Sequence, residues 1–194
     1  MDRNEILQRL IPNSLTAVSA LALALKYRMA WDVPKRMEIY FDGKLSVEGN
    51  SNAFVNTAIE AGLIHCRALL EFLGLCAQDG HLVNIKLPRH WQDDVGIESF
   101  SNSSGPLALV TPTVAVSHYA GPASEAERAL LAVFHATNKG IAHFTTGFNA
   151  ALVDGGAIEV ASRGVPALVI SHLYTPLGLS APDFEIKGRR CGGC

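Results

Sequence analysis

The segment from residue 53 to about residue 77 most constrains how this chain can fold. Apolar side chains cover nearly all of its helical surface, and Asn50, Ser51 and Asn52 offer N-caps directly before it. A helix that is apolar almost all round must be covered by other elements. Because 48% of the 194 residues are hydrophobic and only 18% are charged, the chain can supply that cover. The segment therefore predicts the central helix of a packed domain.

Two further segments carry signals for the start of a helix. Pro-Asn-Ser at residues 12–14 supplies a break and a cap before an Ala- and Leu-rich helix that ends at about Trp31. Ser-Glu-Ala-Glu at residues 124–127 matches the capping box and predicts a helix to about residue 144. We expect the helices that begin near residues 53 and 124 to pack antiparallel at the centre of the domain, because each has a long apolar face.

The connections between these helices have different patterns. Residues 80–121 are rich in Pro, Gly and Ser and predict a long irregular excursion, with extended pieces near 107–116. Asp79-Gly80 is expected to end the central helix. At about residues 37–47, apolar and charged residues alternate around an Asp-Gly turn signal, which predicts a short hairpin.

The last predicted helix completes the fold class. Residues 158–173 fit a helical stripe that Pro166 must kink, and two strands are the alternative. Together the segments predict a mainly all-α fold, a four-to-five-helix up-and-down bundle. We expect residues 1–187 to form one domain, and residues 188–194 to form a flexible tail because few apolar groups anchor them.

Charge and the N-terminal sequence restrict the classes of partner. A net charge of -2 and a pI near 6.4 exclude a generally basic nucleic-acid binder, so any such site is local. The apolar run at residues 14–25 is shorter than a bilayer span, and mixed charges precede it. We therefore expect a cytoplasmic protein with no membrane partner. Cys66 and Cys76 lie on an apolar segment, which is typical of reduced core cysteines.

A narrow polar stripe interrupts the apolar surface of the predicted central helix. An advance of about 100° per residue places Asn56, Glu60, Arg67 and Glu71 within a sector of about 60°. Two interpretations remain for charges on such an apolar helix. They either satisfy one another in an ion-pair network, or they line a functional cleft in which Arg67 binds a ligand.

The helix after the capping box repeats the pattern with the opposite sign. Arg128, His135, Lys139 and His143 share one sector of its surface, so Arg128 and His135 are candidate binding residues. If the two stripes meet, the glutamates of the first would raise the pKa of a neighbouring histidine and prepare it to act near neutrality. An ordinary exposed or core histidine is the alternative for His135 and His143.

A family resemblance rests on two short segments. Residues 138–143 read Asn-Lys-Gly-Ile-Ala-His on a late helix, and residues 64–72 of the central helix read Ile-His-Cys-Arg-Ala-Leu-Leu-Glu-Phe. This combination resembles the HEPN-like superfamily, which has a four-helix core with an Arg, four to six intervening residues and a His. The resemblance implies a homodimer that brings two such motifs together. It also implies RNA or a cognate partner protein, in a defence or toxin–antitoxin system.

The resemblance implies roles for individual residues as well. His143 takes the place of the motif histidine, and Asn138 takes the place of the motif arginine, so the phosphate-binding guanidinium is absent there. Lys139 supplies a point charge but not a bidentate fork. In a metal-independent ribonuclease, His143 would act as general base on a ribose 2′-hydroxyl while Asn138 and Lys139 contact phosphate. Glu71 or Glu60 would orient the histidine.

The histidines and terminal cysteines also raise a metal hypothesis. Helical bundles hold metals between facing helices, and His65, His135 and His143 are the candidate ligands. The chain has no Glu-x-x-His or His-Glu-x-x-His spacing to support them, so we predict no cofactor. Cys191 and Cys194 form a single C-x-x-C pair, which is half a zinc site at the chain end.

Two classes of function therefore remain, with a metal-binding bundle behind them. The sequence favours a non-catalytic or degenerate HEPN-like bundle that acts through dimerisation or through ligand or RNA binding, because the motif arginine is absent. The alternative is a metal-independent HEPN-type endoribonuclease. Whether the protein is an enzyme stays open at this point.

Overall fold

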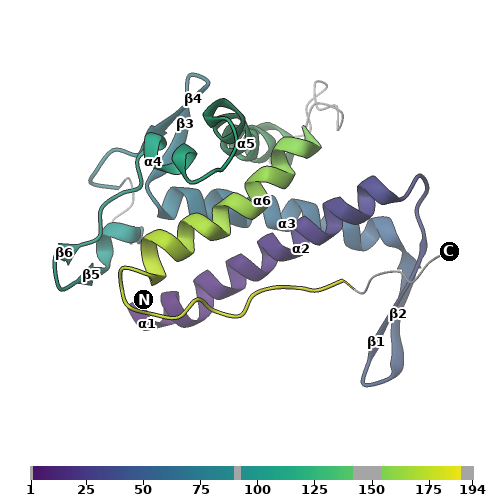
Figure 1. Cartoon of the computed structure of the whole chain (residues 1–194). Helices are drawn as coiled ribbons and strands as arrows, with labels where there is room; N and C mark the ends of the chain where they lie inside the picture. The colour runs from purple at the N-terminus through teal and green to yellow at the C-terminus, as the bar shows by residue number, and fades with distance from the viewer. Residues whose placement is uncertain (1, 90–92, 142–153, 189–194) are drawn as a thin grey trace.

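The computed structural model describes residues 2–89, 93–141 and 154–188, and within them the chain is mainly helical with three small antiparallel hairpins (Figure 1). The helical elements are α1 (Arg3–Glu5), η1 (Ile6–Leu10), α2 (Ile11–Ala30), α3 (Ser51–Phe72), η2 (Ile97–Ser99), α4 (Pro112–Ser117), α5 (Ala123–His135), η3 (Ala136–Ile141), α6 (Gly155–Val169) and η5 (Ile170–Tyr174). The hairpins pair β1 (Arg36–Phe41) with β2 (Lys44–Asn50), β3 (Leu75–Gln78) with β4 (His81–Asn84), and β5 (Ser101–Asn102) with β6 (Gly105–Pro106). The mainly helical fold class is confirmed, and the hairpins add an antiparallel β component to it.

The contact between α2 and α3 is the most extensive between helices in the described residues. Leu15, Val18 and Leu21 of α2 are fully buried there. At Gly62 of α3, a Cβ would lie 2.3 Å from the Leu21 Cβ and 2.9 Å from the Ala17 carbonyl oxygen. Because no side chain fits into this space, the glycine allows the two backbones to approach closely.

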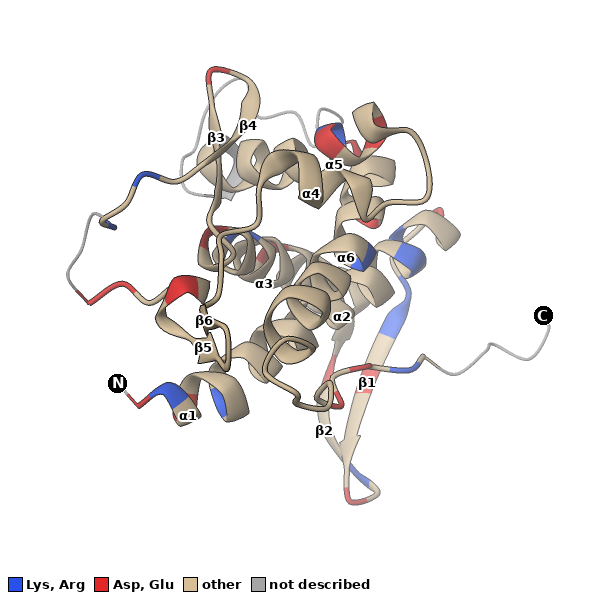
Figure 2. Ribbon diagram, turned by 60° about the vertical axis from the view of Figure 1, so that its left-hand side comes forward, with Lys and Arg blue, Asp and Glu red and all other residues tan. Residues whose placement is uncertain are grey.

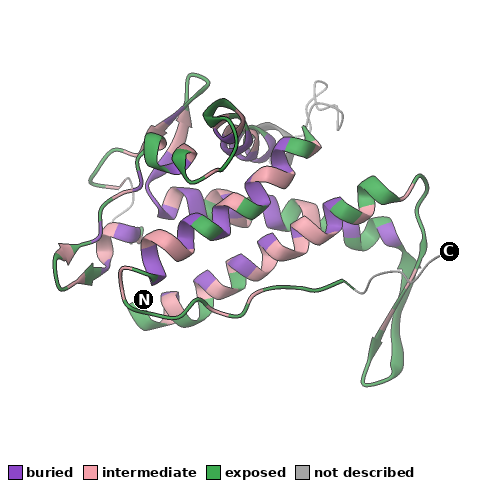
Figure 3. Ribbon diagram, in the orientation of Figure 1, coloured by how far each residue is buried: buried purple, intermediate pink, exposed green. Residues whose placement is uncertain are grey.

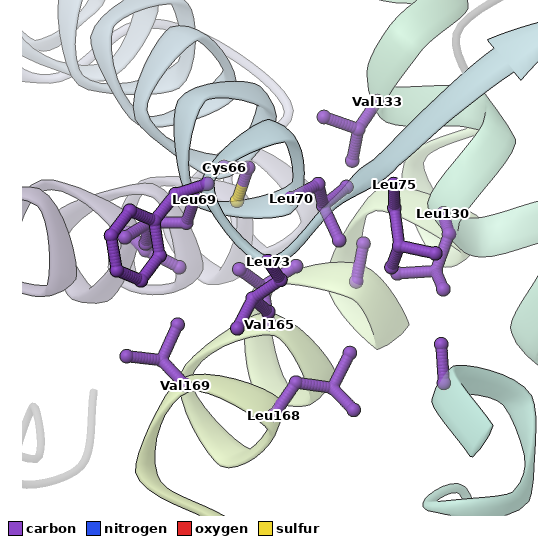
Figure 4. Close-up of a cluster of buried hydrophobic side chains, with 14 of the residues drawn as sticks. Cys66, Leu69, Leu70, Leu73, Leu75, Leu130, Val133, Val165, Leu168 and Val169 are labelled. Carbon is purple, nitrogen blue, oxygen red and sulfur yellow. The ribbon is translucent and has the colours of Figure 1, made fainter. Parts of the chain in front are cut away.

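A second pair, α5 and α6, packs over this one and closes the core. Figure 4 shows side chains from α3, β3, α5 and α6 pointing toward one another in an apolar cluster. Its labelled members are Cys66, Leu69, Leu70, Leu73, Leu75, Leu130, Val133, Val165, Leu168 and Val169. Figure 3 shows the same pattern over the helical body, where buried positions turn inward and exposed positions turn outward. α3 and α5 contact each other, as predicted, but α3 packs mainly on α2 and α5 mainly on α6, so they are not the main helix pair of the core.

The first helix differs from its prediction in its start and its length. The chain is helical from Arg3 to Ala30 without a break, and Ser14 donates to the Leu10 carbonyl at 2.9 Å instead of capping a new helix. Pro12 stands at the junction of η1 and α2, where the hydrogen-bond pattern changes from that of a π-helix to that of an α-helix. This helix of 28 residues contains an 18-residue window with mean hydropathy 1.2, so by length and composition alone it could cross a membrane. The argument that the apolar run is too short to span a bilayer is therefore wrong. The core helix of a soluble protein passes the same test. The cytoplasmic location remains a prediction.

The central helix ends earlier than its sequence predicted. It stops at Phe72 because Gly74 takes a φ of +96°, in the left-handed region, and the next residues form β3. Asp79 and Gly80 have φ values of +52° and +80° and make the two-residue turn between β3 and β4. The apolar run of residues 53–77 thus contains both a helix and a strand, two structures that a short apolar run does not distinguish.

The second half of the chain corrects three predictions and confirms one. The capping box at Ser124 does not form, because α5 begins at Ala123 with Pro122 in the cap position and without a side-chain cap. Its predicted end at residue 144 lies outside the described residues. The extended pieces expected at 107–116 give way to α4 from Pro112. The helical interpretation of residues 158–173 is confirmed by α6 and η5, and the two-strand alternative is wrong.

The hairpin predicted at residues 37–47 is confirmed as β1 and β2. Asp42 and Gly43, with φ values of +49° and +77°, form its two-residue turn. The hairpin projects away from the helical body, and every residue of β2 is exposed (Figures 1 and 3). At the other end of the chain, the predicted tail of residues 188–194, with Cys191 and Cys194, lies outside the described residues except for Gly188.

Candidate functional site

Arg67 is the centre of the predicted polar site. Its Nε donates to Glu71 Oε1 at 2.8 Å along α3, and its Nη1 donates to Oδ1 of Asn138 in η3. Arg67 belongs to the polar stripe of α3, but Asn138 is the motif position and not a member of the basic stripe, so this contact does not test whether the two stripes meet. The Arg67 side chain is 36% exposed, the Glu71 side chain is 42% exposed, and Asn138 is exposed. The arrangement is a surface hydrogen-bonded ion pair, in which a carboxylate largely neutralises the guanidinium.

Other members of the two stripes lie away from this cluster. Glu60 is exposed and lies three turns earlier on α3, about 16 Å from Glu71 along the helix axis. Asn56 accepts a hydrogen bond from Arg28 of α2 at 3.1 Å. The Nε of Arg128 lies 3.6 Å from Oδ2 of Asp154, which caps α6. The structure thus brings together Arg67, Glu71 and Asn138 but not the whole set.

The predicted histidines do not meet one another in the described structure. His135 is exposed at the end of α5, and His65 lies on α3 with its Nδ1 at 3.1 Å from the Ser14 Oγ of α2. His143 lies outside the described residues, as does the side chain of Lys139. Within the described ranges no group of three or more His, Cys, Asp or Glu residues could hold a metal ion. The three-histidine metal hypothesis therefore has no geometric support here.

The charges on the surface of the described residues do not form a basic patch that would attract a polyanion. Figure 2 shows Lys and Arg residues dispersed among Asp and Glu residues over several elements. The two described cysteines are poor nucleophiles. Burial raises the pKa of the Cys66 thiol to about 12. Burial and then the charge of Glu71 raise the pKa of Cys76, so both thiols stay protonated at neutral pH.

A partly buried ion pair that the sequence did not reveal fixes the end of α3. Arg89 donates through Nε to Glu98 Oε1 at 2.6 Å and through Nη2 to Oε2 at 3.0 Å. It also donates to the carbonyl oxygens of Glu71 at 3.0 Å and Phe72 at 3.2 Å. A guanidinium is favourable at a helix C-terminus, where carbonyl groups lack partners. Both side chains come from the irregular excursion, so no local pattern announces their contact.

Two histidines form a second unforeseen contact. The Nε2 atoms of His118, after α4, and His172, in η5, lie 3.1 Å apart. Burial and then the charge of His118 lower the pKa of His172, which favours a neutral ring. His118 also lines a cavity of about 260 Å³ between α5 and α6, smaller than typical ligand sites. A groove of about 430 Å³ beside α2 is lined by Lys26, Arg163 and Glu185 among other residues. Because both signs of charge are present, the groove does not indicate whether a ligand would be anionic or cationic.

The main exposed apolar surface lies at one end of the molecule. We call it the hairpin end, and define it by the β1–β2 hairpin together with the exposed residues at the helix ends beside it. Its large exposed apolar side chains are Met29, Val33, Tyr40, Phe41, Leu45, Val47 and Phe54. The Phe41 side chain is 63% exposed, and that of Tyr40 is 54% exposed. The alternation that predicted the hairpin was the available signal for this surface, because it implies one apolar face.

Comparison of the chain with protein-family models, with curated proteins and with solved structures finds no match. The resemblance to the HEPN-like superfamily therefore rests on the two segments around Arg67 and Asn138 and stays a hypothesis. The function has to be argued from the geometry of the residues themselves.

Proposed function

We propose that this protein is a non-catalytic helical binding protein that assembles with a protein partner through its hairpin end. In this proposal the helical elements form an up-and-down bundle that carries the hairpin, and the hairpin makes the contact. The class of function is the one that the sequence favoured, a bundle acting through association. The cytoplasmic location and the homodimer belong to the same proposal.

The observation that carries the proposal is the uncovered apolar surface of the hairpin end. Phe41, Leu45 and Val47 lie on a hairpin that contacts the helical body only through its base. Their burial against the domain therefore contributes little to its folding. Phe41 and Val47 share one face of the hairpin, whereas Leu45 lies opposite Tyr40 on the other face. Exposed apolar side chains of this kind are characteristic of protein contact sites, and aromatic residues are enriched at such sites.

The geometry around Arg67 supports binding in preference to catalysis. Its guanidinium is engaged by Glu71 and Asn138, so its charge is not directed at an empty position. The described cysteines are protonated at neutral pH, and neither Glu71 nor Asn138 contacts a histidine of the described residues. A general base beside an oxyanion-binding group is the arrangement that hydrolytic sites need.

In-cell photo-crosslinking tests the proposal. A photoreactive amino acid replaces Phe41 at the hairpin tip, and in a control chain it replaces His81, the exposed first residue of strand β4. We expect the Phe41 position to crosslink to protein, either this chain or another, and the His81 position to give much less product. Equal labelling at the two positions, or no protein adduct at Phe41, would contradict the proposal.

A second candidate function is the binding of RNA phosphate at the Arg67 cluster. The observation that favours it is the contact of Arg67 with Asn138, because a guanidinium from α3 lies beside the position where the resembling motif has its arginine. Release of Arg67 from Asn138 would free it for a phosphate oxygen, with Lys139 adjacent in the chain. His143 would then be the general base of the ribonuclease alternative.

Fluorescence anisotropy with a labelled single-stranded RNA at low salt tests this second function. Arg67→Ala should weaken binding and Asn138→Arg should strengthen it, since the latter restores a guanidinium to the motif. Arg163→Ala, an exposed arginine on α6, is the matched control. If the wild type neither binds nor cleaves the RNA, the second function is excluded.

A further inference from the structure

The two edges of the β1–β2 hairpin differ in how well they can accept another strand. β2 pairs with β1 through a register shift between Ile39 and Tyr40, which leaves Ser46 as an extra, bulged residue. Bulges disturb an edge and oppose further pairing, and β2 also contains Gly49. β1 is regular over its six residues, from Arg36 to Phe41. β1 is therefore the edge that is open to a new strand.

The two faces of the hairpin have different chemistry. Register and alternation place Met37, Ile39 and Phe41 on one face, with Val47 opposite Ile39. Arg36, Glu38 and Tyr40 therefore occupy the other face. On that face Arg36 Nη2 lies 2.9 Å from Glu38 Oε1, and the Tyr40 hydroxyl donates to Glu38 Oε2 at 2.7 Å. The free edge thus presents alternating apolar and polar residues.

The hairpin turn determines which backbone groups of β1 point to the free edge. In a hairpin with a two-residue turn, the last pair exchanges both backbone hydrogen bonds, and here that pair is Phe41 and Lys44. The pattern alternates along the strand. The backbone N–H and C=O groups of Tyr40, Glu38 and Arg36 therefore face outward, whereas those of Ile39 and Met37 face β2.

We propose that a second copy of this chain docks on this edge, with β1 antiparallel to the partner's β1 and Ile39 opposite the partner's Ile39. This inference rests on the proposed function and names its partner. Glu38 then faces the partner's Tyr40, and both have backbone groups directed to the new edge. Met37 faces the partner's Phe41 on the apolar side. Arg36 reaches the partner's Asp42 at each end of the contact.

Charge selects this register over its neighbours. Centring the pair on Glu38 would place two glutamates directly opposite each other. Centring it on Tyr40 would bring Arg36 against the partner's Lys44 and Glu38 against the partner's Asp42. Like charges opposite each other destabilise a sheet. A shift by one residue between the two copies would set outward backbone groups against inward ones. Of the registers centred on Glu38, Ile39 and Tyr40, the Ile39-centred one therefore satisfies both conditions, and it pairs every residue of β1.

The arrangement also explains why the partner is a copy. It has a two-fold axis through Ile39, so one strand supplies both halves of each contact, as in most soluble homo-oligomers. Antiparallel pairing directs the two helical bodies to opposite ends of a four-stranded sheet, where they do not collide. A two-stranded hairpin is marginal in water, and additional strands make a sheet stable. The second copy therefore completes the sheet.

Disulfide trapping tests the register in purified full-length protein. Single cysteines replace Glu38, Ile39 or Tyr40 in a Cys76→Ser, Cys191→Ser, Cys194→Ser background, and a Val47→Cys chain on β2 is the control. A residue on the two-fold axis faces itself at a Cα separation of about 4.5 Å, which a disulfide spans. We expect the Ile39→Cys chain to crosslink about tenfold faster than the others. Faster crosslinking at residue 38, 40 or 47 would overturn the proposed register.

A matched pair of turn variants tests the charge contact by sedimentation. Asp42→Asn keeps an Asn-Gly turn but removes the carboxylate that Arg36 would meet, and should raise the dimer dissociation constant by about fivefold or less. Asp79→Asn makes the same change in the Asp-Gly turn between β3 and β4, and should leave the constant unchanged. Equal effects of the two variants would contradict the contact.

The outcomes separate this inference from the proposed function. If the purified chain is monomeric at about 100 μM while Phe41 still crosslinks to another protein in cells, the second copy is wrong and the docking function stands. If a dimer forms but no hairpin cysteine traps it, both the register and the hairpin end as contact surface are wrong.

Discussion

The α2–α3 contact and the β1–β2 hairpin contain the same kinds of apolar residue, but these residues have different roles in the two places. At the first, Leu15, Val18 and Leu21 are fully buried and Gly62 allows the backbones to touch. At the second, Phe41 is 63% exposed on a hairpin that extends from the body. Apolar burial stabilises a fold only where a second surface covers it. The helix contact therefore accounts for stability, whereas the hairpin has apolar surface available for association.

The largest effect in this comparison is expected at Gly62. Gly62→Ala should destabilise the protein by about 2 kcal/mol, because the new Cβ overlaps Leu21 and the Ala17 carbonyl and the helices must separate. The control is Gly164→Ala in α6, where a Cβ meets nothing within 4 Å. That variant should gain about 0.5 to 1 kcal/mol from helix propensity. Urea denaturation measures both, and a neutral Gly62→Ala would show that the helix contact is not tight.

A somewhat smaller effect is expected at the ion pair that ends α3. Arg89→Met should cost about 1.5 kcal/mol, since it leaves the half-buried Glu98 carboxylate and two helix carbonyls without their donor. Arg163→Met is the control, because its ion pair with Glu159 is exposed, and it should change stability by less than about 0.5 kcal/mol. Similar losses in the two variants would contradict a specific role for Arg89.

The same ion pair predicts an acid dependence. Burial is the largest single influence on Glu98 and acts to raise its pKa. The hydrogen bond from Arg89, a backbone hydrogen bond and the charge of Arg89 together outweigh burial, and the net pKa is lowered from 4.5. A lowered carboxyl pKa means that the stabilisation is present above 4.5 and is lost as the pH falls through the lower folded value. Unfolding measured from pH 5 downward should show this loss in the wild type, and a weaker one in Arg89→Met.

Short-range sequence patterns, such as turn residues and the alternation of a strand, predicted the elements that depend only on neighbouring residues. The Asp42-Gly43 turn and the alternation around it predicted the hairpin, because turn chemistry and strand period agree there. At Asp79-Gly80 the same turn signal followed an apolar run, and helix and strand gave the same pattern. The capping box at Ser124 failed because Pro122 occupies the cap position and the helix begins two residues earlier than predicted.

Contacts between distant residues explain what the sequence could not predict. Helical spacing singled out Arg67 and the family resemblance singled out Asn138, but no local pattern predicted that these two residues contact each other. The contacts of Arg89 with Glu98 and of His118 with His172 join residues from irregular segments, where no period fixes an orientation. The role of Gly62 likewise depends on its contact with α2, and the sequence of α3 alone does not indicate that contact.

A smaller pH effect is expected where α4 meets the end of α6. Burial and then the charge of His118 lower the pKa of His172 from 6.5, so folding disfavours its charged form. The sign is opposite to that of a histidine with an acidic partner. Stability should decrease as the pH falls below 6.5 toward the lower folded value. His118→Gln should reduce this slope between about pH 6.5 and 5, and an unchanged slope would show that the pair is not coupled.

The smallest change in monomer stability is expected at the hairpin tip. Phe41→Ala removes a large apolar side chain that the helical body does not cover, so the unfolding free energy of the monomer should change by less than about 0.5 kcal/mol. Phe134→Ala removes the same side chain from the core, where it is 2% exposed, and should cost about 3 to 5 kcal/mol. Protein concentration then sharpens the comparison. If two copies pair through β1, the melting temperature of the wild type rises with concentration, because association stabilises the folded state by mass action. Phe41→Ala should reduce that dependence, since it removes the contact with the partner's Met37. A melting temperature that is equally independent of concentration in the wild type and in Phe41→Ala would show that the hairpin's apolar face has no second copy to cover it.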